Sequence, residues 1–212
     1  LWNNCLRSLP LPSITNLKLT KDNNIITFNL DIKIDKKNKR DFNPKTSYSS
    51  NEFPFNRIVF GAPGTGKSHT LEKDANKILS SNKFLERVTF YQDYSYSKFF
   101  GTYKPVSSKK GINYEFVPGP FMTTYIKAMQ QSFEEKPQPC ILLIEEINRA
   151  NPAATFGDIF QLLDRNSDNV SKYPISINQD VQNYLCTILG GKPSDYDKLI
   201  IPNNMYIWAT MN

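Results

Sequence analysis

The stretch GAPGTGKS at residues 61–68 constrains the fold of this chain more than any other feature of its sequence. It matches the pattern GxxxxGK[S/T], follows the apolar run RIVF at 57–60, and precedes a segment, 67–80, whose apolar residues recur at helical spacing. Glycine lets the backbone N–H groups of such a loop converge on phosphate oxygens, and the start of a helix adds positive potential there. The order of strand, glycine-rich loop and helix therefore predicts a phosphate-binding loop.

The prediction gives individual loop residues their roles. Lys67 is expected to neutralise the β- and γ-phosphates of a nucleotide, and Ser68 is expected to offer its hydroxyl to Mg²⁺. His69 is expected to lie on the helix surface beside the phosphates rather than to act in catalysis. The predicted nucleotide-binding residues are Gly61, Ala62, Pro63, Gly64, Thr65, Gly66, Lys67, Ser68 and His69.

A second stretch, ILLIEEINRAN at 141–151, ends an apolar run on two adjacent carboxylates. A phosphate-binding loop needs one carboxylate near Mg²⁺ and another that orients or activates the attacking water. Glu145 is predicted to take the metal side, where a Walker B motif more often has aspartate, and Glu146 the water side. Consecutive strand residues point to opposite faces, so the two acids can serve one site only where the strand ends. We expect this strand to lie beside 57–60; a salt-bridged surface pair is the alternative.

Apolar runs and segments of helical spacing follow one another along residues 51–212. Continuous apolar strands between helices indicate a parallel sheet covered by helices on both faces, so the sequence predicts an α/β fold. The expected strands are 57–60, 87–91, 140–144 and 205–212, and the expected helices are 67–80, 120–133, one helix from Pro152 through Leu163, and 181–191.

The first 50 residues differ from the rest in charge and in pattern. They hold nine Lys or Arg against four Asp or Glu, a balance of +5 out of the net charge of +6. Alternation over 25–35, with LKL at 17–19 before it, predicts a β-hairpin. The basic run KIDKKNKR at 33–40 favours a solvated linker, with nucleic-acid attraction as the alternative. We therefore predict a β-rich segment and basic linker at 1–50 and a nucleotide-binding domain at 51–212.

The cysteine pattern and the hydropathy of the chain indicate its cellular compartment. Cys5, Cys140 and Cys186 are far apart, and with one His in the chain they do not suggest a zinc site. Cys140 is expected to pack as a small buried apolar residue. No apolar run reaches the roughly 20 residues of a membrane helix, and no signal-peptide pattern opens the chain. These features predict a cytoplasmic protein without a membrane partner.

Two further segments admit more than one interpretation. The stretch FYQDYSYSKFFGTY at 90–103 holds seven aromatics in fourteen residues. Such clusters usually fill a core or a subunit interface, although stacked aromatics also bind single-stranded nucleic acid. The expected helix 181–191 is amphipathic and ends at Gly190, which favours packing over a role in a pore or in partner binding.

Five segments together resemble McrB-type AAA+ proteins, the NTP-hydrolysing subunits of modification-dependent restriction systems. They are GAPGTGKS, FYQDYSYSKFFGTYKP, YEFVPGPF, ILLIEEINRANPAATFGDIFQLLD and IPNNMYIWATMN, spread over about residues 53–212. The resemblance implies an AAA+ core followed by a small helical lid, and homo-oligomeric rings that are commonly hexameric. It also implies hydrolysis of GTP, with ATP as the other possible substrate. The resemblance further implies a partner endonuclease subunit, DNA translocation and cleavage, and an upstream domain that reads DNA.

The resemblance also assigns residues. Gly64, Gly66, Lys67 and Ser68 would hold phosphates, with Lys67 among the catalytic residues. Glu145 would assist Mg²⁺ and Glu146 would position water. Asn212 matches the family's sensor-1 asparagine and is the third catalytic candidate. Asn148 and Arg149 match an Asn-Arg pair expected to face the neighbouring subunit. The sequence stops at Asn212, without the lid or an arginine finger, so this chain alone is expected to be weakly active or inactive.

Two alternatives to a restriction motor stay open. One is an AAA+ ATPase of the dynein-related or MoxR type that remodels proteins. The other is a non-catalytic nucleotide-binding scaffold. The sequence leaves the choice between GTP and ATP open.

Overall fold

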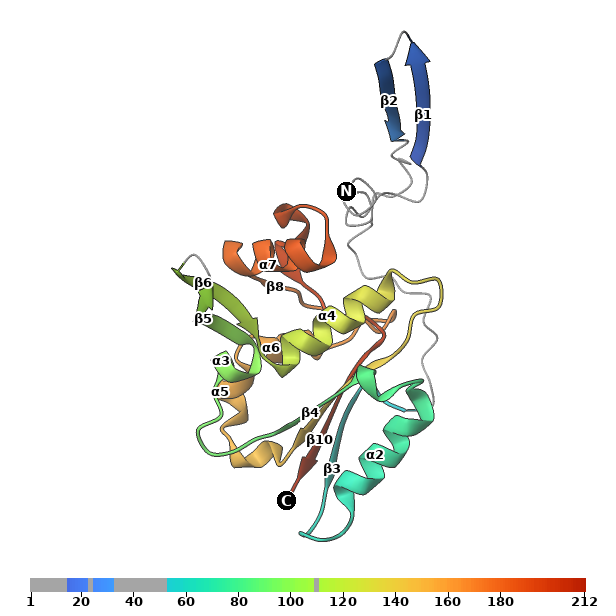
Figure 1. The fold of residues 1–212 in the computed structure, drawn as a ribbon. Helices are drawn as coiled ribbons and strands as arrows, with labels where there is room; N and C mark the ends of the chain where they lie inside the picture. Colours follow the sequence, from blue (N-terminus) through green and yellow to red (C-terminus); the bar gives the residue numbers. More distant parts are fainter. Residues whose placement is uncertain (1–14, 23–24, 33–52, 109–110) are drawn as a thin grey trace. The chain divides into compact units, whose positions relative to one another are not determined.

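The computed structural model describes residues 15–22, 25–32, 53–108 and 111–212, and the chain divides into two compact units, 1–41 and 42–212. In the first unit, strands β1 (Thr15–Asp22) and β2 (Ile25–Ile32) pair antiparallel as the predicted hairpin (Figure 1). Cys5 and the basic run at 33–40 lie outside the described residues. The domain boundary near residue 50 stays a prediction.

The second unit is built on a four-stranded parallel sheet with the strand order β3-β10-β7-β4. The strands are β3 (Asn56–Phe60), β4 (Leu85–Thr89), β7 (Cys140–Glu145) and β10 (Met205–Met211). The expected strand at 87–91 is therefore misplaced by two residues. Pairing ends where Thr89 lies opposite Glu145, and the next side chain, Phe90, turns into the core against Tyr94 and Phe99.

Helices cover both faces of this sheet, which confirms the predicted α/β fold class (Figure 1). Strand β7 alternates between the faces: Ile141 and Leu143 pack under α2 (Lys67–Ile78), whereas Leu142 and Ile144 face the cluster that contains α4 (Pro120–Ser132). Helix α2 ends at Ile78 rather than at residue 80, because the backbone of Leu79 is extended. A 3₁₀ helix, Asn82–Phe84, leads from there into β4.

The helix expected from Pro152 through Leu163 is two helices, so that prediction is wrong. The structure has α5 (Pro152–Phe156) and α6 (Ile159–Leu162), after a 3₁₀ turn at Ile147–Arg149. Gly157 breaks the helix with a φ of 52° and a ψ of −131°, a conformation that side chains disfavour. A Cβ at Gly157 would also lie 3.2 Å from the Tyr96 ring.

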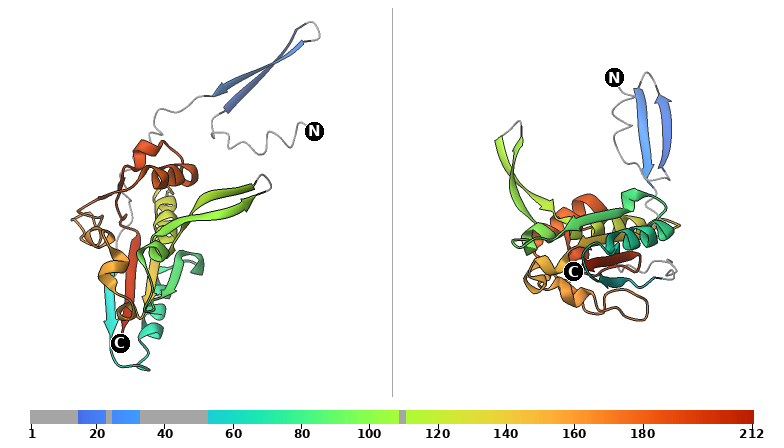
Figure 2. Two further views of the ribbon diagram at one scale, coloured as in Figure 1. Left: turned by 90° about the vertical axis from the view of Figure 1, so that its left-hand side faces the viewer. Right: turned by 90° about the horizontal axis from the view of Figure 1, so that it is seen from below.

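An antiparallel hairpin that the sequence analysis did not predict lies between α3 (Tyr96–Phe99) and α4. Its strands are β5 (Gly101–Ser108) and β6 (Gly111–Pro118), and Figure 2 shows the hairpin projecting from the helices at its base. Phe90, Phe99 and Phe100 of the preceding aromatic stretch are buried in the core. Packing therefore accounts for these three side chains, as expected.

The segment between α6 and β10 packs on the α4 side of the sheet. It comprises β8 (Ile175–Ser176), α7 (Gln179–Leu189), a 3₁₀ helix (Pro193–Tyr196) and β9 (Lys198–Leu199). The apolar face of α7 packs into the core through Val181, Leu185 and Leu189, and the helix ends before Gly190. The expected helix is confirmed, although it spans Gln179–Leu189 rather than 181–191, and its apolar face has a packing role.

Arg165 connects the segment between α6 and β10 to the start of β10. Its guanidinium donates to the carbonyls of Asn169, Ile201, Pro202 and Met205 at 3.0–3.3 Å, and burial lowers its pKa to about 10. We expect Arg165→Met to lower the free energy of unfolding by about 2–4 kcal/mol, because buried carbonyls would lose their donor.

Urea titration compares the unfolding midpoint of Arg165→Met with that of Lys136→Met, a control that removes an exposed cation. Equal midpoints for the two variants would show that the Arg165 contacts do not stabilise the fold.

Two further expectations concern cysteines and membranes. Cys140 is buried in β7 as expected, and burial raises the pKa of its thiol to about 12; Cys140 and Cys186 are both free. Across the ranges that the structure describes, we find no helix with the length and apolar character needed to cross a bilayer.

Candidate nucleotide and magnesium site

The glycine-rich loop joins the end of β3 to the start of α2. Gly64 and Gly66 have φ angles of 79° and 78°, in the left-handed region that glycine adopts readily. Gly66 is the N-cap of α2, and no side chain caps this end of the helix. The first N–H groups of the 12-residue helix therefore have no intrahelical acceptors and are available to an anion.

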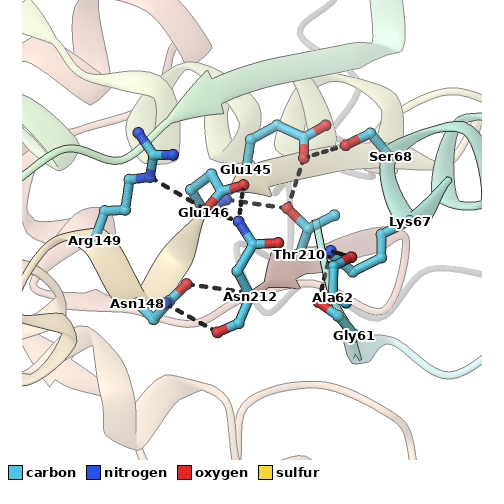
Figure 3. A network of polar contacts seen from close by, with 10 residues as sticks. All are labelled: Gly61, Ala62, Lys67, Ser68, Glu145, Glu146, Asn148, Arg149, Thr210 and Asn212. Carbon is cyan, nitrogen blue, oxygen red and sulfur yellow. Dashed lines mark hydrogen bonds and ion pairs between the residues drawn. The ribbon is translucent and has the colours of Figure 1, made fainter. Parts of the chain in front are cut away.

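Lys67 lies across the mouth of the loop. Its ammonium donates to the carbonyl oxygens of Gly61 at 2.7 Å and Ala62 at 2.8 Å (Figure 3). The ammonium group has three donors, and two of them are used here. Lys67 can therefore bind phosphate oxygens while it stays at the loop. His69 is exposed on α2, as expected.

An ion pair fixes α2 to the strand that precedes the loop. Arg57 of β3 donates to Asp74 of α2 at 2.8 Å, and Lys77 contacts the same carboxylate at 3.0 Å. The hydrogen bond from Arg57 lowers the pKa of Asp74. This ion pair therefore holds together the strand that precedes the loop and the helix that follows it.

The strand that ends on the two acids is not the neighbour of β3, contrary to the expectation. Strand β10 lies between them, pairing with β3 on one side and with β7 on the other. Apolar content alone does not define the order of buried parallel strands, which is why the sequence pattern was misleading here. All these strands run parallel, so their carboxyl ends still meet at one edge of the sheet.

Glu145 is the last residue of β7 and points to the α2 side, like Ile141 and Leu143. Its Oε2 accepts hydrogen bonds from the Ser68 hydroxyl at 2.7 Å and from the Thr210 hydroxyl at 2.6 Å (Figure 3). The structure thus brings the two predicted magnesium ligands, Ser68 and Glu145, into contact.

Glu146 leaves the strand direction at once. Its backbone is left-handed, with φ 57° and ψ 46°, which is uncommon for a residue other than glycine. Its carboxylate accepts from the Asn212 amide and from Arg149 Nε, the latter at 3.2 Å. The two adjacent acids can therefore occupy one site, because the strand ends between them.

The remaining candidates, Asn148 and Arg149, lie in the same network. Asn148 exchanges hydrogen bonds with the backbone of Asn212, at 3.2 and 3.4 Å. The Arg149 side chain is 62% exposed while it pairs with Glu146. The structure thus gives both residues contacts within the chain, and their role at a subunit interface stays a prediction.

Thr210 belongs to this site and was missed by the sequence analysis. Its hydroxyl contacts the Glu145 side chain and the Glu146 backbone N–H. The available signal was its position in β10, where alternation places it on the same face as Trp208 and Tyr206. A threonine near the end of an apolar strand is common enough that this signal is weak.

The site suits Mg²⁺ held jointly with a nucleotide. A serine hydroxyl and a carboxylate are the hard oxygen donors that Mg²⁺ prefers, and this ion commonly takes only one or two protein ligands beside phosphates. Within the described part of the chain, no cluster of three or more His, Cys, Asp or Glu could hold a metal by itself. Ser68 and Glu145 are therefore the residues that would hold the ion.

With this geometry established, comparison with known proteins identifies the class. Residues 56–173, more than half of the chain, match the family described as AAA domain, dynein-related subfamily. The chain belongs to this family. Its similarity to restriction-enzyme components places it with the McrB-type AAA+ NTPases.

Two curated relatives carry that similarity. The chain is 44% identical over 182 residues to the type II restriction enzyme BsuMI component YdiS of Bacillus subtilis (strain 168), covering 75% of this chain and 51% of that protein. It is 30% identical over 166 residues to the type IV methyl-directed restriction enzyme EcoKMcrB subunit of Escherichia coli (strain K12), covering 74% of this chain and 30% of the relative. The chain thus spans about half of the first relative and less of the second.

A solved structure from Cytophaga hutchinsonii, described only provisionally as an ATPase, is also similar. It is 18% identical with a TM-score of 0.39, over 74% of this chain and 34% of that one.

Proposed function

We propose that this chain binds and hydrolyses a nucleoside triphosphate with Mg²⁺, as the motor part of a DNA restriction complex. The observation that carries the proposal is the convergence of Lys67, Ser68, Glu145 and Glu146 at one edge of the sheet. Membership of the AAA family supports hydrolysis, and the names of the two relatives support the restriction context.

The residues divide the work by position. Backbone N–H groups at 61–68 and the Lys67 ammonium would bind the phosphates, and Ser68 and Glu145 would hold the ion. Mg²⁺, when bound, would neutralise phosphate charge. Glu146, turned away from Glu145, would orient the attacking water and accept its proton, while Asn212 and Arg149 hold its carboxylate.

The assembly belongs to the same proposal. We propose a homo-oligomeric, hexameric ring in which Asn148 and Arg149 face the neighbouring subunit. We also propose a partner endonuclease subunit and DNA engaged through an upstream domain, with hydrolysis driving translocation and cleavage. GTP is the proposed substrate, with ATP as the alternative.

Hydrolysis assays with GTP and ATP in parallel, with and without DNA and the partner endonuclease, test the proposal. We expect Mg²⁺-dependent turnover that favours GTP and that rises with the partner. A strong ATP preference without any effect of DNA would instead support a protein-remodelling ATPase. Absence of turnover in the unmutated protein with its partner would support a nucleotide-binding scaffold.

A further inference from the structure

The hydroxyl of Thr210 contacts both acids, the side chain of Glu145 and the backbone N–H of Glu146. Thr210 is 1% exposed and belongs to β10, the strand between β3 and β7. The register pairs Thr210 with Val59 of β3 on one side, and Ala209 with Ile144 of β7 on the other. Thr210 therefore lies beside Glu145, on the face that carries α2.

The hydrogen bonds of Thr210 have a defined direction. The backbone N–H of Glu146 donates to Oγ1 of Thr210 at 3.0 Å, and Oγ1 lies 2.6 Å from Oε2 of Glu145 (Figure 3). An N–H group can only donate and an ionised carboxylate can only accept. The hydroxyl proton must therefore point at Glu145, while a lone pair of the same oxygen receives the N–H of Glu146.

Each bond fixes a different property of the site. The bond to Glu145 holds Oε2 beside the Ser68 hydroxyl, which lies 2.7 Å from the same oxygen. The bond from Glu146 anchors a left-handed backbone, a conformation that residues other than glycine seldom adopt. That turn directs the Glu146 carboxylate toward Asn212 and Arg149 rather than along the strand.

We infer that Thr210 is a positioning residue that sets the metal-side acid and the water-side acid relative to each other. The inference rests on the proposed function, because the acids have these roles only in a nucleotide site. Groups that orient metal ligands in this way typically change metal affinity or activity by about 10–100-fold when they are removed.

The test compares Thr210→Val with Thr210→Ser in the purified protein, using a fluorescent non-hydrolysable GTP analogue and a matching ATP analogue. Valine has nearly the shape of threonine without the hydroxyl, and serine keeps the hydroxyl. We expect Thr210→Val to reduce the Mg²⁺-dependent gain in nucleotide affinity by about tenfold or more. Affinity without Mg²⁺ should not change, and Thr210→Ser should restore the gain.

Thr124→Val is the matched control, because Thr124 is fully buried in α4 and its hydroxyl donates to the Pro120 carbonyl on the other side of the sheet. A Mg²⁺-dependent gain in Thr210→Val equal to that of the unmutated protein would overturn the inference. An equal defect in Thr210→Ser, or in the control, would also overturn it. If the unmutated protein shows no Mg²⁺-dependent nucleotide binding, the proposed function fails and the inference fails with it.

Discussion

Replacing Glu146 with Gln is expected to reduce nucleotide hydrolysis by about 10²–10⁴-fold while nucleotide binding persists. The amide keeps the size and most hydrogen bonds of the carboxylate but cannot accept the proton of the attacking water. Its oxygen can still accept from Asn212 and Arg149, so the turn at 145–149 should be retained. Initial rates of the full-length protein with its partner endonuclease, at saturating Mg²⁺ and nucleotide, and a separate binding titration measure the two effects.

Glu135→Gln is the matched control, because it makes the same change at an exposed position after α4. Its rate should equal that of the unmutated protein. A Glu146→Gln protein that hydrolyses nucleotide as fast as this control would show that another group activates the water. A loss of binding together with hydrolysis would show that Glu146 holds the nucleotide rather than the water.

Replacing Lys67 with Ala is expected to weaken nucleotide binding by about 100-fold, and hydrolysis at subsaturating nucleotide should fall at least as far. Hydrogen bonds to charged groups contribute about 1.5–3 kcal/mol each, and about 1.4 kcal/mol is a tenfold change in the dissociation constant. The measurement is the dissociation constant of the fluorescent analogues in the presence of Mg²⁺.

Lys73→Ala controls for the loss of one positive charge on the same helix, because Lys73 is exposed on α2. Its dissociation constant should be close to that of the unmutated protein. Thermal unfolding should also be similar for both variants, since the acceptors of Lys67 are carbonyls of its own loop. Equal nucleotide affinity in the two variants would contradict the role given to Lys67.

The sequence was most informative where chemistry is local. The glycine-rich loop needs left-handed backbone at Gly64 and Gly66 and a helix start at Lys67. Residues adjacent in the sequence meet each of these requirements. The same holds for Glu145, because the apolar run of β7 defines the strand end that carries it. Local patterns therefore predicted the fold class and brought attention to both acids.

Features that depend on distant partners were harder to predict. Any order of buried strands satisfies the same apolar runs, so the sequence did not show that β10 separates β3 from β7. The break at Gly157 depends on a conformation that helical spacing does not report. Strand β6 did carry a signal that the prediction overlooked, because Ile112, Tyr114 and Phe116 alternate with polar residues. Thr210 acquires its role only when β10 and β7 are adjacent. The strand order and the role of Thr210 would each require knowledge of pairing across the sheet.

The most direct measurement is a structure of the protein with a non-hydrolysable GTP analogue and Mn²⁺, whose anomalous scattering marks the metal. We predict phosphates against the loop 61–68 and a single metal peak beside the Ser68 hydroxyl and the Glu145 carboxylate. Glu146 should face the terminal phosphate across from Asn212. Nucleotide bound elsewhere, or a metal peak away from Ser68 and Glu145, would contradict the assignment of this sheet edge as the site.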